Sequence, residues 1–268
     1  TYAPAPAYAP PPAPVYSSPA YAAPMPAEAE DQERGTIGIS PEYAYQMLDH
    51  AENVNKREIV LLEAKLDGLL NDTVTVSGGL TVIANYQRSN RNSKFAYLMR
   101  HPTSANQIGK TASEIVVHSG QVALTAQITD YLTAYAELLY NPEQSFGAGT
   151  LVDINRNQIE MRKAFILLGN LKKSPFYLAA GKMDMPFGLQ DTVSPFTNST
   201  TWHAFAPLAY GGTVGYYKNG LHLRAAAMQG GAQFRSANAD VDGTAVPSRV
   251  ANWSVDGSYK LKFADNAD

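Results

Sequence analysis

The chain has 268 residues, a formal net charge of −3 and only 17% charged residues. Cysteine is absent, which excludes disulfide bonds, thiolate metal sites and cysteine nucleophiles. The charge balance does not indicate a nucleic-acid partner, and the sequence has no run of about 20 apolar residues that would predict a transmembrane helix. Low charge combined with 16 Tyr and 20 Gly is typical of a β-rich protein.

Residues 1–39 predict a linker. Nine of the 17 prolines fall between Pro4 and Pro26, and this Pro/Ala/Tyr-rich stretch contains no charged residue. Proline fixes φ and cannot donate a backbone hydrogen bond, so such a tract favours polyproline II or a disordered spacer. The alternative is a docking site for a partner such as a cell-wall component. Because the chain starts with Thr1, we expect a signal peptide to have been removed.

Residues 40–71 predict a helix. Ser40 suits the N-cap, Pro41 suits the first helical position, and no Gly or Pro follows until Gly68. Apolar side chains recur here at a 4-3 spacing, which favours a coiled coil and a homotrimer, and a buried Asn in the seam can set the register. The alternative is an amphipathic helix packed on the chain's own sheet. The expected seam consists of Leu48, Asn55, Ile59, Leu62, Leu66 and Leu69.

Residues 72–268 change to a period of two, which predicts β-strands. In one strand Val122 and Leu124 share an apolar face, while Gln121 and Thr125 share the opposite, polar face. The strand near 156–169 is ambiguous because its second half is apolar on both faces. It is either buried on both sides or covered by an inward-folded loop. The eight expected strands lie near residues 73–87, 113–128, 131–141, 156–169, 176–187, 211–218, 221–229 and 249–263.

The connections between these strands alternate in length. Tight turns are expected at 129–130, 170–175 and 219–220, with longer loops between them. This layout is typical of an outer-membrane barrel, whose periplasmic turns are short and whose extracellular loops are long. In hydrocarbon every backbone polar group needs a partner, and a sheet achieves this by closing. The expected fold is therefore an all-β transmembrane antiparallel β-barrel, with about 16 strands if the chain is truncated or 8 if it closes.

No catalytic constellation stands out. The five histidines lack metal-ligand spacing, and Gly109-Lys110-Thr111 resembles the end of a phosphate loop but has Ser104 where that motif requires glycine. We therefore expect no enzyme, no cofactor and no metal site.

The polar face of the predicted strands carries both signs of charge. One interpretation is a water-filled pore whose ion preference these side chains tune; the other is that opposite charges pair inside a plugged or narrow barrel. Alternation along the strands places the following candidates on this face: Glu137, Glu160, Arg162, Lys182, Asp184, His222, Arg224, Asp256, Lys260 and Lys262.

The segment AGKMDMPFG at 180–188 resembles a motif of the phosphate-selective porins of the O/P type and of the related siderophore-porin (LbtU-like) family. The resemblance implies an outer-membrane diffusion channel for small hydrophilic solutes, with an anion or a chelated metal as the solute and residues 1–39 in the periplasm. Two other functions stay open. One is a structural tether that joins the barrel to the cell wall through residues 1–39. The other is a siderophore receptor that binds through loops 88–112 and 188–210.

Overall fold

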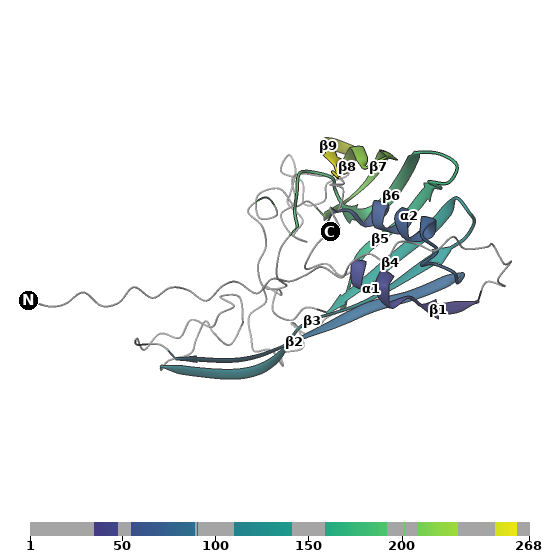
Figure 1. The fold of residues 1–268 in the computed structure, drawn as a ribbon. Helices are drawn as coiled ribbons and strands as arrows, with labels where there is room; N and C mark the ends of the chain where they lie inside the picture. Colours follow the sequence, from purple (N-terminus) through teal and green to yellow (C-terminus); the bar gives the residue numbers. More distant parts are fainter. Residues whose placement is uncertain are drawn as a thin grey trace, which may run out of the picture. The chain divides into compact units, whose positions relative to one another are not determined.

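The structure is a computed structural model that describes residues 35–47, 55–88, 90, 110–140, 159–191, 201, 208–229 and 250–261. All of them belong to one compact unit, residues 34–268. A nine-stranded sheet and two helices make up this part of the chain (Figure 1). The elements are β1 (Ile37–Ile39), α1 (Pro41–Gln46), α2 (Arg57–Leu66), β2 (Val74–Arg88), β3 (Thr111–Gln127), β4 (Leu132–Tyr140), β5 (Ile159–Gly169), β6 (Phe176–Asp184), β7 (Leu208–Lys218), β8 (Leu221–Gln229) and β9 (Val250–Tyr259).

The strands follow one another in the sheet in chain order. β2 to β9 form an antiparallel meander and correspond to the eight strands predicted between residues 72 and 268, so the β-rich fold is confirmed. β1, which the sequence analysis did not predict, pairs in parallel with Val74–Val76 at the edge of β2. The tight turn at 219–220 has positive φ at both residues, 52° for Asn219 and 82° for Gly220. This is the backbone that a two-residue Asn-Gly hairpin favours.

The two faces of the sheet differ sharply in burial. We call the face that carries α1 and α2 the inner face, and the opposite face the outer face. One row of register partners on the outer face is entirely apolar and partly or fully exposed: Leu132, Leu168, Leu178, Val214, Ala225 and Val255. The next row points to the inner face, contains three hydroxyl side chains and is buried: Thr133, Leu167, Ala179, Thr213, Ala226 and Ser254.

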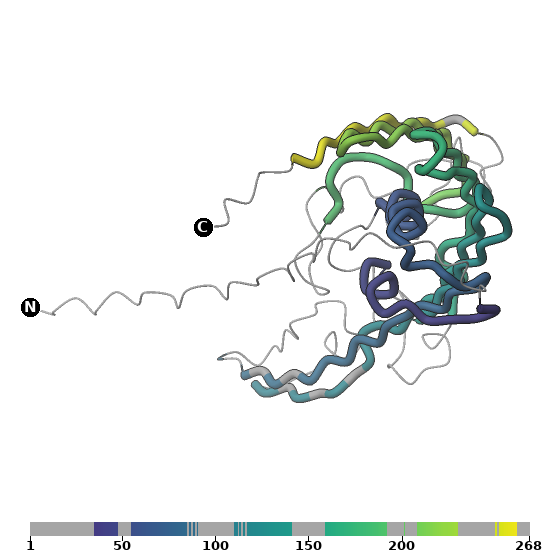
Figure 2. The backbone as a smooth tube through the Cα atoms, turned by 45° about the vertical axis from the view of Figure 1, so that its right-hand side comes forward, coloured from purple at the N-terminus to yellow at the C-terminus, as the bar shows by residue number. Residues whose placement is uncertain are grey.

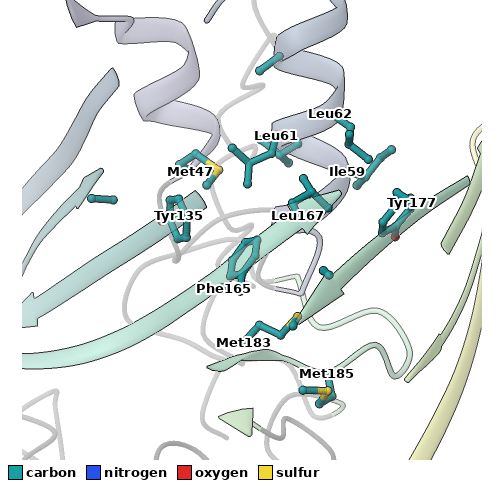
Figure 3. Close-up of a cluster of buried hydrophobic side chains, with 14 of the residues drawn as sticks. Met47, Ile59, Leu61, Leu62, Tyr135, Phe165, Leu167, Tyr177, Met183 and Met185 are labelled. Atoms are coloured by element: carbon teal, nitrogen blue, oxygen red, sulfur yellow. The ribbon is translucent and has the colours of Figure 1, made fainter. Parts of the chain in front are cut away.

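Both helices lie on the inner face, and Figure 2 shows the strands curving around them. Ile59, Leu61 and Leu62 of α2 are buried in one apolar cluster with Tyr135, Phe165 and Leu167 of the sheet (Figure 3). At the start of α1 the Tyr43 amide donates to Ser40 Oγ (3.4 Å), so Ser40 caps the helix as the sequence predicts. In the part of the chain that the structure describes, neither helix has the length and apolar character needed to cross a bilayer.

The single helix predicted over 40–71 is wrong, because the structure has two separate helices there. α1 ends at Gln46, α2 begins only at Arg57, and Lys56 has a non-helical backbone with φ −124° and ψ 18°. The Asn55 carbonyl accepts from Arg224, and the Asn55 amide group donates to the Gly188 carbonyl (3.1 Å). These contacts hold residues 55–56 against the sheet instead of in a helix.

The residues of the expected coiled-coil seam pack mainly on the chain's own sheet. Asn55, Ile59 and Leu62 are buried within the chain, Leu69 is partly buried against the same cluster, and Leu66 is exposed. Leu48 lies outside the described residues. A 4-3 apolar spacing indicates only that one side of a helix is buried. It does not show whether that side packs against a second helix or against a sheet. The burial of Ile59 and Leu62 favours the alternative of an amphipathic helix packed on its own sheet.

The ambiguous strand, β5, has two distinct faces. Phe165 and Leu167 are buried under the helices, whereas Ile166 and Leu168 are exposed on the outer face. The apolar run on both faces therefore has a simple cause: one face contacts the helices and the other belongs to the apolar outer surface.

Candidate functional site

The candidate site is the polar inner face together with the two helices that cover it. Among the described residues, the ion pairs of its charged side chains include three within the sheet. Arg162 Nη1 lies 3.5 Å from Glu137 Oε1, and Lys163 Nζ lies 2.5 Å from Asp184 Oδ2. Arg224 pairs with Asp256. Glu137 and Lys163 are fully buried, which makes the pairing essential, because an unpaired buried charge costs several kcal/mol, roughly 3–5.

A bulge between β4 and β5 brings the first two of these pairs together. Glu137 is the register partner of Lys163, but the next residue on β4, Leu138, is opposite Met161. Arg162 is therefore the extra residue on β5, and it turns toward Glu137 beside Lys163 instead of alternating with it. The Tyr135 hydroxyl donates to the other carboxylate oxygen, Glu137 Oε2 (2.7 Å). One carboxylate thus accepts a hydrogen bond at Oε2 and takes part in an ion pair at Oε1.

Besides the apolar cluster, hydrogen bonds to inner-face side chains join the helices to the sheet. Toward the β3 and β4 end of the sheet, the Tyr43 hydroxyl and Thr125 Oγ1 are hydrogen-bonded (2.6 Å), and Lys65 Nζ donates to Thr133 Oγ1 (3.0 Å). On β7, farther along the same inner face, the Tyr217 hydroxyl donates to Glu63 Oε1 (2.5 Å). Further contacts join Gln121 Nε2 to the Met47 carbonyl (3.2 Å), Arg224 to the Asn55 carbonyl and Lys56 Nζ to Asp191 Oδ2 (2.5 Å).

Aromatic side chains close the inner face between β6 and β8. The Tyr177 hydroxyl and His222 Nε2 are 2.7 Å apart, and the Tyr217 ring meets the His222 ring edge-on with centroids 5.6 Å apart. The Tyr177 ring lies over Gly215, where an added Cβ would come within 2.1 Å of ring carbon Cζ. Glycine is therefore required at 215 to leave room for this ring.

The structure brings together six of the ten candidates that alternation placed on the polar face. Glu137, Arg162, Asp184, His222, Arg224 and Asp256 all lie in the contacts described above. Lys182 does not join them: it lies on the same face of β6 as the exposed Leu178 and Ala180, and its Nζ donates to the Met161 carbonyl (2.9 Å). Glu160 and Lys260 are exposed. Lys262 lies outside the described residues.

Lys163 is the main functional candidate that the sequence analysis missed. Strict alternation from Glu160 and Arg162 places Lys163 on the outer face, and only the bulge reverses it. The available signal was the odd-numbered series Lys163, Phe165, Leu167, which is the face that α2 covers. Arg57 and Glu58 were also missed, because neither belongs to the seam expected for the helix over 40–71.

Glu58 is a buried carboxyl on α2. Only 1% of its surface is exposed, and its Oε1 has no hydrogen-bond partner among the described residues. Burial raises the pKa of the Glu58 carboxyl above its ordinary value. The charges facing it have smaller effects on this pKa, because Arg224 on β8 and Lys163 on β5 lower it while Asp184 on β6 raises it.

We predict that Glu58→Gln stabilises the protein at neutral pH but not in acid. The pKa of Glu58 is higher in the folded chain than in the unfolded chain, so its favourable contribution is complete below the unfolded value, about 4.3, and is lost as the pH rises through the raised folded value. Urea unfolding should show the variant more stable than wild type at pH 8 and equally stable at pH 4. Glu42→Gln, at an exposed position on α1, is the control. A gain of equal size at both pH values would contradict this account.

The inner face carries groups that can bind water and polar solutes. Among the described residues no three His, Asp or Glu side chains gather in a way that could hold a metal ion. The face offers paired charges, hydroxyl groups and amides, each of which can form hydrogen bonds with water when it is uncovered.

Comparison with known proteins gives distant relatives. No family model matches the chain, and no solved structure matches it. A UPF0422 protein of Coxiella burnetii is 30% identical over 146 residues, which cover 52% of this chain and 30% of that protein. Two UPF0422 proteins of Legionella pneumophila, from strains Lens and Philadelphia 1, are each 28% identical over 104 residues, covering 38% of this chain and 19% of theirs. The chain is thus similar to UPF0422 proteins, but the match spans less than a third of the length of each.

Proposed function

We propose that β2 to β9 form part of the wall of an outer-membrane channel for small hydrophilic solutes. The observation that carries this proposal is the reversed polarity of the sheet. In a water-soluble antiparallel sheet the covered face is apolar and the open face is polar. Here the covered inner face holds the hydroxyl groups of Thr133, Thr213 and Ser254 among apolar side chains, while the row of register partners on the open outer face is entirely apolar. An apolar outer face with a polar inner face is what lipid on one side and water on the other require.

Closure of this wall into a complete barrel belongs to the same proposal. Closure at eight strands would need β9 to pair with β2. Among the described residues β9 pairs with β8, and β1 occupies residues 74–76 at the edge of β2. Both observations favour a barrel of about 16 strands over one of eight.

The inner-face charges favour a channel with weak ion preference. The three ion pairs contain three acidic residues (Glu137, Asp184 and Asp256) and three basic residues (Arg162, Lys163 and Arg224), so their charges sum to zero. A ring of one sign is what confers strong selectivity on a pore. This supports general diffusion over an anion-specific channel.

Conductance across planar lipid bilayers tests the proposal. We expect discrete conductance steps and a reversal potential near zero in a salt gradient, as weak ion selectivity requires. The protein must first be shown to be folded and inserted, by its gel mobility before and after heating. The same measurement is made on Tyr217→Phe, which lacks the contact from β7 to α2. The proposal is overturned if both wild type and this variant are folded and inserted but show no conductance steps.

The tether and the siderophore receptor stay predictions. The first depends on residues 1–39 and the second on loops 88–112 and 188–210, and most of these residues lie outside the described part of the chain. Loss of envelope attachment after deletion of residues 1–36, with unchanged permeability, would favour the tether. Saturable binding of a siderophore would favour the receptor.

A further inference from the structure

We propose that α1 and α2 together form a releasable plug, which closes the channel when it is docked on the inner face and opens it when it leaves. This inference rests on the proposed function and adds a means of regulating the same channel. It follows from where the helices contact the sheet, from the polar side chains of the inner face and from how the chain is fixed before α1 and after α2.

The helices contact strands far apart in the sheet. Tyr43 and Lys65 are bonded to Thr125 on β3 and Thr133 on β4, whereas Glu63 is bonded to Tyr217 on β7. Arg224 on β8 donates to the Asn55 carbonyl just before α2. Because β3 and β8 are five strands apart in a sheet that curves around the helices (Figure 2), the contacts of α1, α2 and Asn55 reach across the inner face.

The inner face around the helices carries polar groups that water can satisfy. The hydroxyl oxygens of Thr75, Ser77 and Ser254 are buried without a hydrogen-bond partner among the described residues, and so is Glu58 Oε1. Each buried, unsatisfied polar group costs about 1–3 kcal/mol, and water would satisfy it once the helices leave. Apolar contacts of α2 favour docking, and these polar groups oppose it. The balance makes the docked state reversible.

The chain is fixed to the sheet before α1 and after α2, by contacts that do not involve the helices. Before it, β1 pairs with the edge of β2. After it, Gln127 Nε2 on β3 donates to the carbonyls of Leu70 (2.7 Å) and Asp72 (3.0 Å). α1 and α2 can therefore leave the inner face and return to it while these two anchors stay in place.

A reversible crosslink between the plug and the wall tests the proposal. The chain has no cysteine, so Glu63→Cys combined with Tyr217→Cys introduces the only two thiols. The wild-type side chains meet at 2.5 Å, which places the new thiols within reach of a short reducible bis-thiol reagent. We expect crosslinking of the full chain in planar bilayers to lower the conductance at least ten-fold, and reduction to restore it.

The matched control links two wall strands without touching the helices. Leu221→Cys and Tyr259→Cys are register partners on β8 and β9, and their crosslink should leave the conductance unchanged. If the plug crosslink forms completely and conductance does not fall, the plug is overturned while the channel stands.

Thiol labelling follows the movement without relying on conductance. Ala64 on α2 is 1% exposed, so Ala64→Cys should react with a water-soluble maleimide only when the plug leaves. We expect its labelling to be at least ten-fold slower than that of Leu66→Cys, which is exposed on the same helix, and to become several-fold faster when Tyr217→Phe is added. Labelling of Ala64→Cys that Tyr217→Phe does not accelerate would overturn the plug. Accelerated labelling in silent bilayers would support the movable plug and count against the channel.

Discussion

Arginine in place of Val214 is expected to stop the sheet from entering a bilayer. Val214 is 47% exposed at the outer face of β7, between its register partners Leu178 on β6 and Ala225 on β8. If this face contacts lipid, an arginine here costs about 2–4 kcal/mol near the bilayer centre. We expect a large loss of the heat-modifiable, protease-resistant form when the variant is folded into lipid vesicles.

Ser258→Arg provides the matched control for this experiment. Ser258 is exposed on β9, and alternation places it on the same face as Ser254 and Asp256. An arginine there would meet water in the proposed channel, so folding into vesicles should stay close to wild type. The opposite outcome is equally informative. A substitution at a water-exposed position changes stability by less than about 0.5 kcal/mol, so a Val214→Arg protein that folds like wild type would place the outer face in water.

The strands and their faces could be predicted from sequence because both are local properties. Gln121, Thr125 and Gln127 alternate with apolar residues along β3, and the structure buries these polar side chains while Val122 and Leu124 are exposed. A period of two fixes which residues share a face whatever the neighbouring strands are. The turn at Asn219-Gly220 was equally readable, since its residue types alone favour positive φ.

Features that depend on distant contacts could not be predicted in this way. The break between α1 and α2 depends on Asn55, whose partners Gly188 and Arg224 are more than a hundred residues away in the sequence. β1 is only three residues long and pairs in parallel with β2, so it has too few positions for a periodic pattern. The apolar spacing in 55–69 indicated that one side of the helix is buried. Only the structure shows that this side packs against the sheet.

In the candidate site too, local pattern predicts some residues correctly and distant contacts decide the others. Glu137, Arg224 and Asp256 were placed correctly on the inner face, because strict alternation holds around them. It fails at the bulge opposite Glu137, which turns Lys163 inward. A bulge adds one residue to one strand and reverses the alternation beyond it. Nothing in the local pattern of β5 marks the extra residue, so the buried Lys163–Asp184 pair became visible only in the structure.

Removal of the Lys163 amine is expected to cause the largest loss of stability among inner-face substitutions. Lys163 is fully buried, and its Nζ is 2.5 Å from Asp184 Oδ2. In Lys163→Met the apolar stem is nearly retained, but Asp184 loses its partner in a place where only 8% of its surface is exposed. Breaking such a pair on one side costs roughly 3–5 kcal/mol. Urea unfolding at pH 7 should therefore show a strong decrease in the free energy of unfolding.

The double variant Lys163→Met/Asp184→Leu distinguishes a lost ion pair from a lost fit. When both charges are removed, no unpaired charge stays buried, and replacement of a buried pair by apolar side chains is often close to neutral. We expect the double variant to be more stable than Lys163→Met, with a coupling free energy above about 1 kcal/mol in the double-mutant cycle. Two single losses that simply add would show that Lys163 acts through its packing. In that case the neutral charge balance of the inner face, on which the expectation of weak ion preference depends, would lose one of its three pairs.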